Sequence, residues 1–167
     1  MAIRAIVSAC LAAVPCRYDG RDRPDPAVEG LLARGLVLPV CPEQLGGLPT
    51  PRPPAEIRGG DGADVLAGRA RVVTSEGDDV TEAFVLGART ALKVARACGA
   101  RLAYLVDRSP SCGTTLIYDG SFEGRLRPGR GVTAALLQEQ GIACYGPRDR
   151  QQFLSDILTE GRNNKGC

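Results

Sequence analysis

Short apolar runs alternate along this chain with segments that have helical periodicity. Four runs have the length and composition of buried strands: residues 3–9, 36–40, 102–106 and 142–145. Helices are predicted between and after these runs: 26–34, 80–98, 132–140 and a last one from residue 147. The alternation predicts an α/β fold, a single-domain three-layer sandwich with a mostly parallel sheet and helices on both faces.

Two stretches interrupt this alternation. Residues 41–62 are rich in proline and glycine and have no clear periodicity, so we expect a long irregular loop of the kind that is usually functional or disordered. Residues 114–120 and the turn residues after them predict a hairpin. Residues 71–74 are a weak strand candidate, and Asp79 and Glu82 have the spacing of a capping box at the start of the longest helix.

Length and charge exclude several classes of protein. The chain has 167 residues, the size of one domain, and we expect residues 1–160 to form it and residues 161–167 to be a polar tail. A formal net charge of +2 is too small to indicate nucleic-acid binding by electrostatics alone. No apolar run reaches the roughly 18 residues that a membrane span needs. The N-terminus also lacks the apolar core of a signal peptide, so we expect a cytoplasmic protein.

Seven cysteines and no histidine restrict the chemistry. In a reducing cytoplasm so many thiols favour metal binding or thiol chemistry over disulfides. Without histidine, neither a Cys–His nucleophile pair nor a histidine-ligated zinc site can form. A metal would have to bind mainly to thiolates, which favour iron–sulfur clusters, zinc or copper(I).

Three of the cysteines follow predicted strands, directly or after a short turn: Cys10, Cys41 and Cys112. Because the carboxyl ends of parallel strands border the ligand crevice of such folds, these residues can meet there. Cys16, on the loop above the same edge, is a fourth candidate ligand. A cubane cluster held by only three thiolates would leave one iron open, and this iron could bind a soft substrate atom such as sulfur.

Other roles for the cysteines remain open. All could be small buried residues, which is the favoured interpretation of Cys98 and Cys144, while Cys167 lies in the tail. A structural zinc site on the four candidate ligands is a second alternative, although the chain has no C-x-x-C pair. The ferredoxin C-x-x-C-x-x-C run is also missing, so catalysis is favoured over electron transfer.

Polar residues near these cysteines supply candidate catalytic and binding groups. Glu43 is a candidate general acid/base, or else a surface carboxylate or helix cap. Ser109 and Ser111 place two hydroxyls beside Cys112, although Ser-Pro also favours a turn. Arg52 could hold an anionic or carbonyl group, although a solvated arginine is the commoner outcome. Gly131 precedes a predicted helix whose free N–H groups could bind an anion, and a tight turn explains this glycine equally well.

Ordered motifs from residue 3 to about residue 145 resemble the thiouracil desulfidase family, which was formerly a domain of unknown function. The matching motifs include Ser-Ala-Cys-Leu at 8–11, Cys-Arg-Tyr-Asp-Gly at 16–20, Cys-Pro-Glu at 41–43, Gly-Gly-Leu at 46–48, Pro-Arg at 51–52, Pro-Ala-Glu-Ile at 54–57, residues 79–88, Ser-Pro-Ser-Cys-Gly at 109–113, Ile-Tyr-Asp-Gly at 117–120 and residues 131–137.

The resemblance implies a 4Fe–4S cluster bound by three cysteines and a non-redox desulfuration of 2-thiouracil or a related thiolated pyrimidine. Substrate sulfur would bind the open iron, water would add to the carbon, and uracil and sulfide would result. Carried onto this chain, the ligands are Cys10, Cys41 and Cys112, with Glu43 as proton shuttle and Ser109 positioning the base; Cys16 also belongs to the pattern.

The expected partner is a small thiolated nucleobase or nucleoside, with Arg52, Ser111 and Gly131 as substrate-binding residues, and no membrane. The alternatives are desulfuration of 4-thiouridine or thiolated tRNA, and a non-catalytic zinc module. The resemblance includes relatives with extra domains, which we do not expect in this chain, and its formal net charge is only +2. A small substrate is therefore favoured over tRNA.

Overall fold

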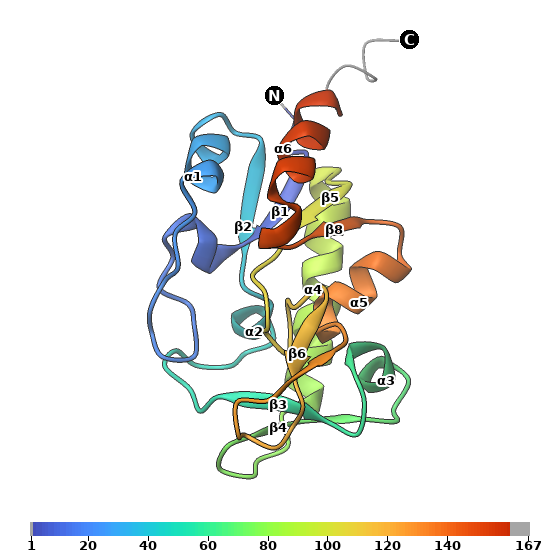
Figure 1. Cartoon of the computed structure of the whole chain (residues 1–167). Coiled ribbons are helices and arrows are strands. Elements are labelled where there is room, and N and C mark those ends of the chain that lie inside the picture. The colour runs from blue at the N-terminus through green and yellow to red at the C-terminus, as the bar shows by residue number, and fades with distance from the viewer. Residues whose placement is uncertain (1, 161–167) are drawn as a thin grey trace.

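A four-stranded parallel sheet lies at the centre of the computed structural model, which describes residues 2–160 (Figure 1). The strands are β1 (Ala5–Ser8), β2 (Val37–Val40), β5 (Leu102–Tyr104) and β8 (Ala143–Tyr145), in the order β2-β1-β5-β8. All three strand pairs are parallel. The four predicted strands are confirmed, each somewhat shorter than its apolar run.

Helices cover both faces of the sheet, as predicted (Figure 1). They are α1 (Pro26–Ala33), α4 (Thr81–Cys98), α5 (Val132–Glu139) and α6 (Arg150–Thr159). On one face the Tyr104 ring stacks on Phe153 of α6, with centroids 4.7 Å apart, and its hydroxyl donates to Asp25, the N-cap of α1. Helices α4 and α5 pack together against the other face. No helix within residues 2–160 is long and apolar enough to cross a membrane.

The segment 41–62, expected to be an irregular loop, contains regular elements, so that prediction was wrong. It holds α2 (Pro42–Leu45) and β3 (Ala55–Arg58), and it leads into α3 (Gly62–Leu66). These elements are too short to show periodicity, and each is stabilised by partners distant in sequence. Strand β3 pairs antiparallel with β4 (Arg71–Thr74), and α2 packs on α4.

A hairpin of β6 (Leu116–Tyr118) and β7 (Leu126–Pro128) confirms the hairpin prediction. Its inner residue Ile117 is buried with Ile57 of β3, Val72 of β4 and Phe84 of α4. This second, smaller core attaches the hairpin and the β3–β4 pair to the N-terminal half of α4. The main core surrounds the parallel sheet.

The predicted capping box at the start of α4 does not form. The helix begins at Thr81, its N-cap position is Val80, and no side chain caps it. Asp79 lies one position before the N-cap, where a backbone bridge to Val73 holds it beside β4. Its side chain accepts a hydrogen bond from the Thr81 N–H. The apolar stripe of α4 is confirmed, and the helix ends at Gly99 in the left-handed region (φ +74°).

Helices α2 and α4 approach each other so closely that two positions require glycine. A Cβ at Gly87 of α4 would lie 1.9 Å from the carbonyl oxygen of Pro42, and a Cβ at Gly46 would lie 2.0 Å from that of Ala83. Both obstacles are backbone atoms, which cannot rotate away. The position of α2 therefore depends on these glycines.

Gly87→Ala is expected to destabilise the protein by about 1–3 kcal/mol, because the added methyl overpacks the α2–α4 contact. The free energy of unfolding from chemical denaturation measures this effect. The control is Gly30→Ala in α1, where an added Cβ meets no atom within 4 Å. That change should be neutral or stabilise by up to about 1 kcal/mol. Equal stability of the two variants would contradict the close contact.

The polar tail predicted for residues 161–167, and with it Cys167, lies outside the described residues.

Candidate active site

A cavity of about 430 Å³ opens at the carboxyl ends of β1, β2 and β5. From β1 the chain passes to β2 on one side, and β5 later pairs with β1 on the other side. Such a reversal of strand order opens a crevice in which α/β proteins commonly bind ligands. The volume suits a small molecule.

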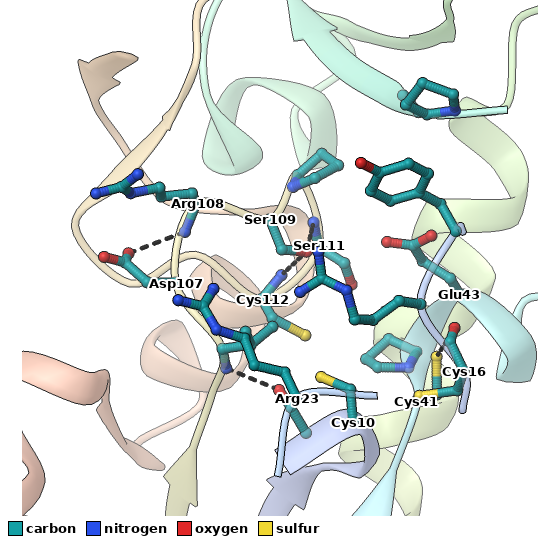
Figure 2. A pocket seen from close by; sticks show the side chains of 18 of the residues that line it. Cys10, Cys16, Arg23, Cys41, Glu43, Asp107, Arg108, Ser109, Ser111 and Cys112 are labelled. Atoms are coloured by element: carbon teal, nitrogen blue, oxygen red, sulfur yellow. Dashed lines mark hydrogen bonds between the residues drawn. The ribbon is translucent and has the colours of Figure 1, made fainter. Parts of the chain in front are cut away.

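The four candidate cysteines all line this cavity. Cys10 lies in the short 3₁₀ helix η1 (Ala9–Ala12) directly after β1, and Cys41 directly follows β2. Cys112 lies on the loop after β5, and Cys16 on the loop after η1. Figure 2 shows their sulfur atoms gathered in one part of the cavity. The sheet thus brings together thiols that are far apart in sequence, as the topology argument expected.

The thiols contact one another and resist deprotonation. Cys41 donates a hydrogen bond to the Cys16 carbonyl oxygen at 3.8 Å. A hydrogen bond with the Cys10 thiol, together with burial, raises the pKa of Cys16 to about 11. The Cys16 thiol and burial raise the pKa of Cys41, and burial raises that of Cys112 to about 12. Because thiols must lose their protons to bind a metal, acid should oppose metal binding here.

The positions of the cysteine side chains bear on which metal group they could hold. Within residues 2–160, no three cysteine, histidine, aspartate or glutamate side chains lie close enough to share one ion. A structural zinc site holds four ligands about 2.3 Å from one ion, and a zinc site on these thiols stays an alternative that the visible absorption of the protein decides. An iron–sulfur cluster places its cysteines on separate irons, and a set of thiols without nitrogen ligands fits that kind of group.

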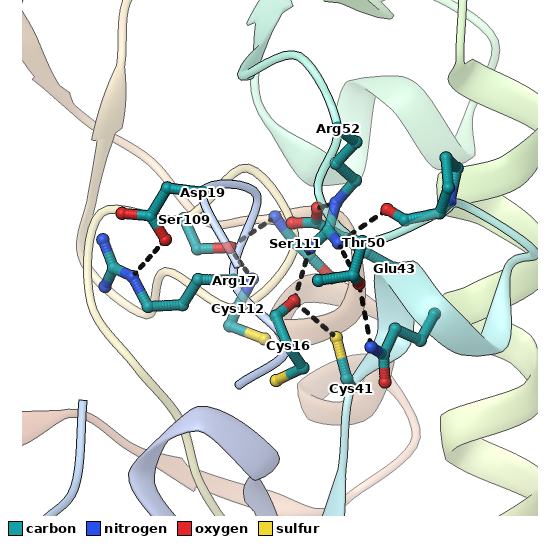
Figure 3. A network of polar contacts seen from close by, with 12 residues as sticks. Cys16, Arg17, Asp19, Cys41, Glu43, Thr50, Arg52, Ser109, Ser111 and Cys112 are labelled. Carbon is teal, nitrogen blue, oxygen red and sulfur yellow. Dashed lines mark hydrogen bonds and ion pairs between the residues drawn. The ribbon is translucent and has the colours of Figure 1, made fainter. Parts of the chain in front are cut away.

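A buried ion pair lies beside the cysteines (Figure 3). Glu43, in the first turn of α2, accepts a hydrogen bond of 2.6 Å from Arg52 Nε. The two side chains are only 16% and 5% exposed. Arg52 also donates to the Cys16 carbonyl oxygen at 2.9 Å. The arginine therefore fixes the carboxylate relative to the Cys16 loop.

Arg52 lines the cavity, but most of its donors are already used. Besides Glu43 and Cys16, it donates to the Pro49 carbonyl oxygen and to Thr50 Oγ1, each at 3.1 Å. An arginine has five N–H donors, so little capacity is left for a substrate. Substrate binding by Arg52 stays a prediction, and the contacts favour a role in positioning Glu43.

The Cys112 loop is ordered by two serines. Ser109 Oγ accepts hydrogen bonds from the Ser111 N–H at 3.1 Å and the Cys112 N–H at 3.0 Å. Its own O–H is not used in these bonds and can donate to a molecule in the cavity, which Ser109 lines. The Ser111 hydroxyl pairs with Thr133 Oγ1 of α5 at 2.9 Å, so it attaches the loop to that helix.

The prediction that Gly131 binds substrate is not supported. The N–H groups of Gly131 and Val132 donate to the carbonyl oxygens of Gly113 and Pro110, each at 2.8 Å. A Cβ at Gly131 would lie 2.4 Å from the Ser111 carbonyl carbon, and the residue is not among those lining the cavity. The start of α5 therefore binds the loop that carries Cys112, and its N–H groups are not available to an anion.

Comparison with known proteins identifies the family. The family model described as 2-thiouracil desulfurase matches residues 5–149. The chain belongs to this family. The resemblance seen in the sequence motifs is therefore confirmed.

Two relatives of this chain match it over almost its whole length. It is 43% identical over 153 residues to the uncharacterized protein YbbK of Bacillus subtilis (strain 168), covering 92% of the chain and 99% of that protein. A solved structure described as a 4Fe-4S-dependent thiouracil desulfidase, TudS, is 42% identical and superposes with a TM-score of 0.83. The match covers 93% of this chain and 98% of that one, so the two share the fold.

The sequence argument did not identify several of the residues that line the cavity. Glu56 of β3 and Phe122 of the hairpin both line the cavity, and so do Arg23 and Arg108. Glu56 belongs to the family-like motif Pro-Ala-Glu-Ile at 54–57. Its role was not predictable from the local sequence, because its hydrogen-bond partners lie in the distant β6–β7 hairpin. Cys98 and Cys144 lie outside the cavity and pack at the edge of the main core, as expected.

Proposed function

We propose that this protein removes sulfur from 2-thiouracil or a closely related thiolated pyrimidine. The products are uracil and sulfide, and no net redox change is needed. The observation that carries the proposal is the convergence of four thiols, Glu43 and Ser109 on one cavity in a chain of this family. The solved relative described as a 4Fe-4S-dependent thiouracil desulfidase supports the same cofactor.

Cys10, Cys41 and Cys112 are the proposed ligands of a 4Fe–4S cluster. Cys10 and Cys41 lie just after neighbouring strands of the parallel sheet, and the Cys112 loop is held against α5, so the fold limits the separation of the three residues. Cys16 lies on a loop and contacts Cys41 through its backbone carbonyl. When bound through three thiolates, such a cluster supplies one iron without a protein ligand, a Lewis acid for the thiocarbonyl sulfur.

Glu43 is the proposed general base and acid. It accepts a proton from the water whose oxygen bonds to the thiocarbonyl carbon. With the substrate bound as its thiolate, Glu43 gives this proton to the deprotonated ring nitrogen, and the second water proton leaves with the sulfur as hydrosulfide when the carbon–sulfur bond breaks. Arg52 keeps the carboxylate in place through the 2.6 Å hydrogen bond. The Glu43 side chain is largely buried, which limits its access to bulk water and keeps the proton near the substrate.

Ser109 is the proposed orienting group. Its oxygen is fixed by two backbone N–H groups, so its O–H can point only within a narrow range. We propose that it donates to the pyrimidine and holds the thiocarbonyl in one orientation. This pre-set geometry lowers the entropic cost of reaching the transition state.

An anaerobic assay tests the proposal. The protein is purified without oxygen, its visible absorption and iron content are recorded, and uracil and sulfide release are measured with 2-thiouracil, 4-thiouracil, 4-thiouridine and thiolated tRNA. We expect a brown protein that releases uracil from a free base. A colourless zinc protein, or release from tRNA alone, would contradict the proposal.

A further inference from the structure

The tip of the β6–β7 hairpin forms one wall of the cavity. Tyr118, Phe122 and Gly124 all line it, although no residue of the hairpin belongs to the sheet that carries the cysteines. The hairpin lies next to β3 (Figure 1). The shape of the cavity therefore depends on how this tip is held.

Glu56 of β3 holds the tip. Its side chain is buried, and its Oε2 atom accepts hydrogen bonds from the Gly120 N–H at 2.8 Å and the Phe122 N–H at 3.0 Å. Hydrogen bonds from backbone N–H groups to a carboxylate are stronger than those between neutral groups. Moving the tip away would leave a buried charge without partners, which is costly.

Phe122 has an unusual backbone conformation. Its φ angle is +60°, in the left-handed region that bulky residues rarely adopt. Gly120 has φ +91°, and a Cβ there would lie 2.7 Å from the Ile57 carbonyl oxygen, so only glycine allows the tip to come this close to β3. Strained residues of this kind gather at functional sites.

Arg58 fixes the aromatic ring as well as the backbone. Its Nε donates to the Gly120 carbonyl oxygen at 2.9 Å, and its guanidinium lies 5.5 Å from the centroid of the Phe122 ring. Glu56 and Arg58 sit two residues apart on β3, so both point their side chains to the same side of the strand. Together they present Phe122 to the cavity in one arrangement.

We propose that Phe122 is the surface on which the planar base of the substrate stacks, and that Glu56 is the positioning residue that presents it. This deepens the proposed function and rests on it, since a thiolated pyrimidine is the ligand considered. An aromatic ring binds any planar base and contributes to affinity without taking part in proton transfer. Phe122 and Glu56 should therefore govern KM and leave kcat almost unchanged.

Steady-state kinetics of the cluster-loaded protein test the stacking role. Phe122→Ala is expected to raise KM for the thiolated base about tenfold and to change kcat less than about twofold. Phe122→Tyr, which keeps the ring, should restore the wild-type KM. Glu56→Ala should raise KM similarly, and the double variant should be no worse than either single one. The matched control is Glu123→Ala, an exposed carboxylate of the same tip that pairs with Arg125.

Hydrogen exchange of the backbone amides tests the positioning role without any activity. In Glu56→Ala the amides of Gly120 and Phe122 should exchange at least about tenfold faster, because their shared acceptor is lost. Glu56→Gln keeps an acceptor oxygen and should fall between this variant and the wild type. Phe122→Ala and Glu123→Ala should leave the Gly120 amide protected. Circular dichroism confirms that each variant is folded.

Several results would overturn the inference. A normal KM with a low kcat in Phe122→Ala would show that the ring serves the chemistry or excludes water. Unchanged exchange in Glu56→Ala would show that the carboxylate does not hold the tip. Failure of the loaded wild-type protein to desulfurate any thiolated base would remove both the proposed function and the stacking role, while the exchange result would still decide the role of Glu56.

Discussion

Alanine at position 112 is expected to leave the protein colourless and inactive. Cys112 is buried, and its loop is fixed to α5 through the Val132 and Thr133 N–H groups, so the backbone should keep its place when the thiol is removed. Loss of a group that merely orients a ligand costs up to about a hundredfold in metal affinity or activity, so loss of a ligand itself should cost more than that. Iron content, visible absorption and uracil release of anaerobically purified Cys112→Ala measure the effect.

Two further cysteine variants complete that experiment. Cys144→Ala removes a half-buried thiol of β8 outside the cavity and should keep the full cluster content. Cys16→Ala decides which three of the four thiols are ligands, and we expect it to retain the cluster. Full iron loading of Cys112→Ala would refute the assignment of Cys112.

Glutamine in place of Glu43 should separate proton transfer from metal binding. The amide keeps an acceptor for Arg52 Nε, so the Cys16 loop and the cluster should remain, but the side chain can no longer accept a proton. A general acid/base contributes roughly 10²–10⁴-fold, and kcat per bound iron is expected to fall by that factor.

The matched control for Glu43→Gln is Glu29→Gln. Glu29 also lies in the first turn of a helix, but it is exposed on α1 and outside the cavity. The control should retain wild-type turnover and iron content. Wild-type turnover in Glu43→Gln would remove Glu43 from the mechanism, whereas loss of iron would show that the ion pair supports the cluster.

The sequence predicts the parts of this molecule that depend on a repeated local pattern. The apolar runs around Ile6 and Ala103 mark strands because a strand buried on both faces is made almost entirely of apolar residues. Once the strands were known to be parallel, their carboxyl ends had to share one edge. That rule of topology placed Cys10, Cys41 and Cys112 together without any knowledge of their contacts.

Features that depend on partners distant in sequence were not predictable in this way. Strand β3 is only four residues long, and it exists because β4 pairs with it. Glu56 looks like an ordinary strand carboxylate until the hairpin folds over it. Gly131 was expected to leave N–H groups free at a helix start, but the Cys112 loop uses them. In each case a tertiary contact decided what the local sequence left open.

Cofactor delivery must wait for the late part of the chain. Cys10 and Cys41 are synthesised early, but Cys112 reaches the crevice only when β5 pairs with β1, with Leu102 opposite Ala5. Pairing of strands so far apart in sequence is intrinsically slow. A nascent chain that has not folded as far as β5 and the Cys112 loop offers an incomplete set of the proposed ligands, so the proposed cluster site can be completed only after this part of the chain is in place.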